Sequence, residues 1–133
     1  MSRRQRDYRA ALSDSERCIE LGFPEHHARG VALYHLHRFP ESLKALELAV
    51  ADGSQGDAAR AYLALYRSAV GDYRQGHDEF SALVAKSDIS VISRLLFGTF
   101  LASCPDSEYR NRGMALEQLQ AIKDADGLLV DVQ

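Results

Sequence analysis

Residues 63–80 read LALYRSAVGDYRQGHDEF, and the neighbouring segments repeat the spacing of small residues in this stretch. Its first small residue after Leu63 is Ala64, which lies 34 positions after Gly30 and 34 positions before Gly98. Small residues at fixed places on successive helices let the backbones approach closely. The spacing therefore predicts a chain built from similar, closely packed helical units.

A second set of positions has the same 34-residue spacing. Ser42 and Gly76 are both small, and Leu46 and Phe80 are both large. Within a unit, the two small positions are 12 residues apart, which places them on the two helices of one hairpin. A single hairpin cannot bury its apolar face alone, so stacking of hairpins is needed to form a continuous core.

Hydrophobic periodicity gives the same picture. Apolar residues at i, i+3, i+4 and i+7 predict helices over residues 6–21, 26–37, 40–51, 58–70, 74–85, 88–102 and 109–123. No window alternates as a strand would, so no strand is predicted. In the last hairpin the small residues Gly98 and Ala115 are 17 positions apart instead of 12. We interpret the extra residues, 104–108, as a longer loop in which Pro105 ends the preceding helix.

This pattern resembles the tetratricopeptide repeat (TPR), whose 34-residue motif runs W-x2-L-G-x2-Y, then A-x3-F, then Pro. Leu63-Ala64 and Phe97-Gly98 match its Leu-Gly pair, and Phe80 matches its Phe, whereas Arg60 departs from the Trp. The resemblance implies an all-α fold, a right-handed α-α superhelix of about seven helices. It also implies one repeat domain over residues 1–133.

The expected boundaries of the domain leave its N-terminal unit incomplete. They are a half repeat at 6–22, repeats at 25–53, 57–86 and 88–123, and a tail at 124–133. Without a first helix before it, the half repeat is expected to leave Tyr8, Leu12 and Ile19 at an open end. Either the chain is a fragment of a longer array, or this end pairs with a second copy in a homodimer.

The resemblance also implies a site, because the first helices of TPR units line a concave groove that binds an extended peptide or a helix of a partner protein. The expected groove residues are His27, Val31, Tyr34, His35, Ala61, Leu65, Ser68, Leu95 and Thr99. Tyr34 has an alternative role as packing within the wall of the solenoid. The Lys and Asn residues of the chain lie outside the first helices, so the carboxylate clamp of some TPR proteins is not expected.

Charge and composition exclude other classes of partner. Lys and Arg total 16 and Asp and Glu total 19, for a net charge of −3, so no nucleic-acid-binding surface is expected. The arginines at positions 3, 4, 6 and 9 are interpreted as a solvated terminus.

No apolar run reaches the ~20 residues of a membrane span, and no secretory signal is present, which favours a cytoplasmic protein. Cys18 is expected at a buried site and Cys104 near a loop, where it is more accessible, both as free thiols.

No pattern indicates catalysis, a metal or a cofactor. His27 and His35 are eight positions apart rather than three or four, and no Cys or carboxylate completes a ligand set. P-loop, G-x-S-x-G and G-x-G-x-x-G motifs are absent. The sequence therefore predicts a non-enzymatic scaffold that binds another protein. The alternative is an architectural or oligomerisation segment of a larger regulatory protein, with no ligand in its groove.

Overall fold

The structure is a computed structural model that describes residues 2–53, 55–86 and 89–130. Its seven helices are α1 (Arg3–Glu20), α2 (His26–His35), α3 (Phe39–Asp52), α4 (Asp57–Ala69), α5 (Tyr73–Val84), α6 (Val91–Ser103) and α7 (Arg112–Val130). The described residues contain no strand, and the all-α prediction is confirmed. No helix in the described part of the chain is long and apolar enough to cross a membrane.

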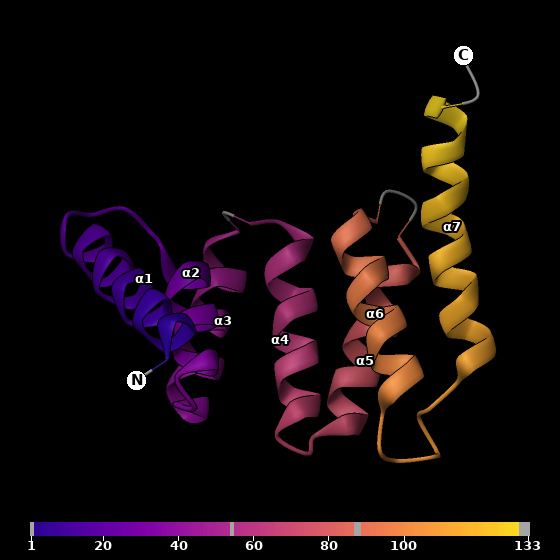
Figure 1. The fold of residues 1–133 in the computed structure, drawn as a ribbon, viewed down its shortest axis with the longest axis horizontal. Helices are drawn as coiled ribbons and strands as arrows, with labels where there is room; N and C mark the ends of the chain where they lie inside the picture. Colours follow the sequence, from indigo (N-terminus) through magenta and orange to yellow (C-terminus); the bar gives the residue numbers. More distant parts are fainter. Residues whose placement is uncertain (1, 54, 87–88, 131–133) are drawn as a thin grey trace.

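The helices follow one another in a row from the N-terminus to the C-terminus (Figure 1). The most extensive contacts join α2 to α3, α4 to α5 and α6 to α7. Helix α4 connects these pairs, because it also packs against α3 on one side and α6 on the other. The predicted helical hairpins are therefore present.

The small residues lie where the helices of each pair meet. In the first pair, the Ser42 hydroxyl donates a 2.7 Å hydrogen bond to the carbonyl of Gly30. In the second pair, a Cβ atom added to Gly76 would lie 2.8 Å from the carbonyl oxygen of Ala64. In the third pair, the same construction at Gly98 gives ordinary contact distances, the shortest being 3.7 Å. Close backbone approach is thus tightest in the first two hairpins.

The turns that end α2 and α4 have the same hydrogen-bond pattern. The N–H groups of His37 and Arg38 donate to α2 carbonyls at 3.0 and 2.9 Å, and those of Gly71 and Asp72 donate to α4 carbonyls at 3.0 and 2.9 Å. Both turns need a left-handed residue, with φ of 62° at His37 and 101° at Gly71. Glycine adopts this conformation freely, whereas another residue in it costs about 1–2 kcal/mol.

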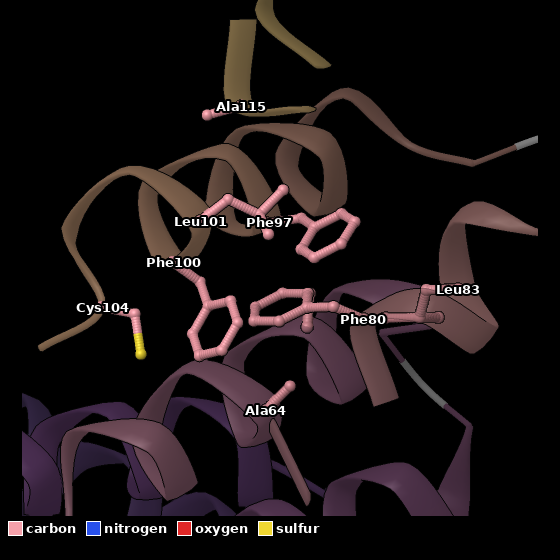
Figure 2. Packing of buried hydrophobic residues seen from close by; sticks show 9 residues of the cluster. Ala64, Phe80, Leu83, Phe97, Phe100, Leu101, Cys104 and Ala115 are labelled. Carbon is pink, nitrogen blue, oxygen red and sulfur yellow. The ribbon is translucent and has the colours of Figure 1, made fainter. Parts of the chain in front are cut away.

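The largest apolar cluster lies among α4, α5, α6 and α7 (Figure 2). Phe80 of α5 is fully buried at its centre, with ring centroids 5.1 Å from Phe97 and 5.5 Å from Phe100. The cluster also buries Ala61, Ala64, Leu83, Leu101, Cys104 and Ala115. One core therefore joins the second and third hairpins.

Two expectations from the sequence are wrong. The segment 124–130, predicted as tail, continues α7 to Val130; residues 131–133 lie outside the described chain. A hydrogen bond of 2.7 Å from Gln120 to Asp124, one turn apart, supports this extension, and a single glycine at 127 weakens a helix without ending it. The two thiols are free, but Cys104 is the buried one and Cys18 is only half-buried, because Cys104 packs into the core at the end of α6.

Candidate functional site

The N-terminal helix turns its apolar side inward. Leu12 is only 8% exposed and packs in a cluster with residues of α2 and α3. The Tyr8 ring stacks on the His35 ring at 4.2 Å, and Ile19 lies beside His26 in a shallow depression. Leu12 is therefore buried against α2 and α3, whereas Tyr8 and Ile19 are only half-buried. Pairing of this end with a second copy stays a prediction.

A row of aromatic rings links α2 to α4. The rings of Tyr34 and Tyr66 stack at 3.7 Å with an angle of 4° between their planes. Tyr62 meets Tyr66 edge-on at 5.8 Å and His27 edge-on at 5.0 Å. Burial, followed by the neighbouring Tyr62 and Tyr34, raises the pKa of Tyr66, so its hydroxyl stays protonated. Helices α2 and α4 thus share a neutral aromatic cluster in which Tyr66 is buried and Tyr34 and Tyr62 are half-buried.

This row forms one wall of a cleft of about 410 Å³, which we call the tyrosine cleft. Its lining residues come from α2, from α4 and from the segments around α5 and α6. They are Tyr34, His35, Tyr62, Leu65, Tyr66, Ser68, Ala69, Tyr73, Phe100, Ser103, Cys104 and Pro105. None of them is Asp, Glu, Lys or Arg, so the cleft suits an uncharged, largely apolar segment of a ligand.

Hydrogen bonding within the described part of the protein uses the serine hydroxyls of the cleft as donors but leaves the Tyr62 hydroxyl free. The Ser68 hydroxyl donates to the Leu65 carbonyl at 2.6 Å, and the Ser103 hydroxyl donates to the Thr99 carbonyl at 2.6 Å. Among the described residues, Tyr62 and Tyr66 form no hydrogen bond through their hydroxyls. Tyr66 is only 3% exposed, whereas Tyr62 is half-buried and Ser103 is exposed. A bound peptide backbone could therefore use the Tyr62 hydroxyl as a donor and the Ser103 hydroxyl only as an acceptor.

The structure brings part of the expected groove together. Tyr34, His35, Leu65 and Ser68 all line the tyrosine cleft. Sequence reasoning missed Tyr62, Tyr66, Tyr73 and Phe100. Tyr66 and Phe100 are 34 residues apart and occupy the same place in successive units. Extending the alignment beyond the small residues would have revealed this second pair.

The other expected groove residues lie elsewhere. Ala61 is fully buried, because α6 packs against α4 and covers it. Val31 packs against the cluster that contains Leu46, Leu63 and Tyr66, and His27 lies behind Tyr62 rather than in the cleft. Leu95 and Thr99 are exposed on α6 outside the cleft lining, and the Thr99 hydroxyl donates to the Leu95 carbonyl. Ala61 is therefore removed from the binding surface.

Burial also affects the histidines around the cleft. It lowers the pKa of His27 and of His35, and the nearby charges of Arg4 and His37 lower that of His35 further. In the unfolded chain both imidazoles titrate near 6.5, so the unfolded state binds more protons just below that pH. We expect the melting temperature to fall as pH drops from 7.5 to 5.5. Calorimetry across this window tests the sign.

The matched variant for this pH effect is the pair His27→Gln and His35→Gln made together. It removes both groups, so its melting temperature is expected to change less over the same window. A melting temperature that rises as the wild-type chain is acidified would contradict the lowered pKa values of His27 and His35.

Among the described residues, no group of three or more His, Cys, Asp or Glu side chains could hold a metal ion. None of the protein-family models, curated proteins or solved structures compared with the chain matches it. The TPR resemblance therefore depends on the 34-residue pattern and on the contacts described above.

Proposed function

We propose that the chain is a TPR-like solenoid, coiled as a right-handed superhelix, and that it acts as a non-enzymatic scaffold for another protein. Two observations support the repeat. Small residues spaced by 34 positions lie at equivalent helix contacts, and the turns after α2 and α4 share their hydrogen bonds at the same spacing. The repeat explains why first helices α2, α4 and α6 contribute to one surface.

The observation that carries the binding function is the tyrosine cleft. Four tyrosines and one phenylalanine line an uncharged hollow that α2, α4 and α6 build together. Tyrosine is enriched at protein interfaces, where its ring supplies apolar contact and its hydroxyl a hydrogen bond. Stacking of Tyr34 on Tyr66 holds both rings before a ligand arrives, which reduces the entropy lost on binding. A peptide or a helix of a partner fits this surface.

Blocking the cleft at its rim tests this function. Ala69 and Ser103 are exposed lining residues, so Ala69→Arg and Ser103→Arg place a long charged side chain in the cleft without disturbing the core. We expect either change to weaken binding of a partner identified by affinity purification about tenfold or more, with the helical circular dichroism retained. Isothermal titration calorimetry measures the affinity.

Ala82→Arg is the matched control, because Ala82 is exposed on α5 away from the cleft lining. It should bind as the wild type does. Equal affinity of all three variants would contradict binding in the cleft.

The alternative, an oligomerisation segment, has support at the other end of the chain. Leu116 is 66% exposed and Leu119 is 45% exposed, one turn apart on α7. A partner surface there would be independent of the cleft. Unchanged binding in the cleft variants, combined with loss of self-association on Leu116→Glu, would favour this second function.

A further inference from the structure

A second depression, of about 310 Å³, opens beside the tyrosine cleft and shares Tyr34 and His35 with it. We call it the basic depression. Its other lining residues come from the N-terminal end of α1 with its cap, from the turn after α2 and from the start of α3; they are Ser2, Arg4, Gln5, Tyr8, His37 and Phe39. None of its lining residues is acidic. A ligand in the tyrosine cleft could therefore continue across Tyr34 into a site of different charge.

The charge of the basic depression is not neutralised by the protein. Within the described part of the chain, Arg4 forms no ion pair, whereas Arg17, Arg29, Arg38 and Arg67 do. Arg4 and His37 line the basic depression together with His35, which belongs to the shared wall. An anionic group placed there would meet unpaired positive charge.

The backbone at His37 gives an independent reason to expect a ligand. His37 has a left-handed φ of 62°, and the corresponding turn after α4 uses Gly71 with φ of 101°. Glycine would form the same turn without strain, so His37 occupies a backbone conformation that is unfavourable for a residue with a side chain. Strained residues of this kind are found mostly where the side chain or backbone is used. Here the side chain lines the basic depression.

We propose that the basic depression binds an Asp or Glu side chain of the peptide whose apolar part occupies the tyrosine cleft. This inference depends on the proposed function. Arg4 supplies an ion pair to the carboxylate, and His37 supplies an N–H donor. The partner is then a segment in which an acidic residue adjoins an apolar run. The positive charge of the basic depression gives the preference for an acidic residue, and the apolar run of the peptide supplies most of the area buried on binding.

Peptide display followed by fluorescence anisotropy tests the proposal. Random peptides are selected on the full chain, and the best binders are synthesised with acetylated and amidated ends, so that no terminal carboxylate remains. We expect the binders to carry Asp or Glu beside an apolar run. Changing that residue to Asn or Gln should weaken binding about three- to fivefold, the effect of one exposed ion pair.

Two variants separate binding from folding. His37→Gly should keep or raise the melting temperature, because glycine relieves the strained turn, yet weaken the acidic peptide about threefold. Arg4→Gln should weaken the same peptide, whereas Arg3→Gln is the matched control, since Arg3 does not line the basic depression. His37→Gly and Arg4→Gln should both bind the neutral Asn or Gln peptide as the wild type does.

The outcomes distinguish the two proposals. In one outcome, Ser103→Arg blocks the binders, but they show no preference for Asp or Glu and do not respond to His37→Gly or Arg4→Gln. This result would overturn acid recognition by the basic depression and leave binding in the tyrosine cleft in place. Binders that Ser103→Arg does not affect, or a selection that yields no binder, would overturn both.

Discussion

Replacing Phe80 by alanine is expected to lower the free energy of unfolding by about 3–5 kcal/mol. Phe80 is fully buried, and its ring packs against those of Phe97 and Phe100, with centroids at 5.1 and 5.5 Å. It comes from α5, whereas both partners come from α6, so the ring joins two hairpins (Figure 2). Removing it leaves a cavity at this junction. Urea denaturation followed by circular dichroism measures the loss.

Phe23→Ala is the matched control, because the same atoms are removed from a side chain that is 61% exposed. Its effect should stay within about 1 kcal/mol. Equal destabilisation by the two substitutions would mean that the core is not centred on Phe80.

Gly76→Ala is expected to destabilise the protein by about 1–3 kcal/mol, against the usual trend. In a helix interior, alanine is normally more stable than glycine by about 0.5–1 kcal/mol. Here a Cβ would lie 2.8 Å from the Ala64 carbonyl oxygen and 3.2 Å from the Ser68 Cβ. The first of these atoms is backbone, so relief requires α4 and α5 to move apart.

Gly98→Ala tests the same chemistry where space exists. Gly98 is also a buried helical glycine, but the nearest atom to its added Cβ would be 3.7 Å away, an ordinary contact. This variant should be neutral or more stable by up to about 1 kcal/mol. We therefore expect the free energy of unfolding to fall with Gly76→Ala and to stay the same or rise with Gly98→Ala. Destabilisation of the same size by both substitutions would contradict the close packing of α4 on α5.

Local pattern was sufficient to predict most of the fold. Apolar periodicity located all seven helices, and the break at Pro105 placed the long loop before α7, because these features depend on neighbouring residues. The end of α7 was missed, since the acidic residues and Gly127 resemble a tail and the helix continues regardless. Cys104 lies near the loop as predicted, but its burial was missed because this depends on how α6 packs against α4 and α5.

The site was less predictable. Tyr34, His35, Leu65 and Ser68 were found because their helices have a recognisable outer face. Ala61 shares that face by periodicity, but α6 covers it, and no spacing within α4 reveals where α6 packs. The stacking of Tyr34 on Tyr66 likewise depends on the angle between α2 and α4, which is a tertiary property.

Backbone amide NMR of the full chain, titrated with its bound partner segment, tests most directly whether the tyrosine cleft is the binding surface. The largest shift changes should fall on residues that line the cleft from three helices, such as Tyr34, Tyr66 and Ser103, with little change at Ala82. Changes confined to α7 around Leu116 and Leu119, with the cleft residues unmoved, would contradict it and favour an interface at the C-terminal end.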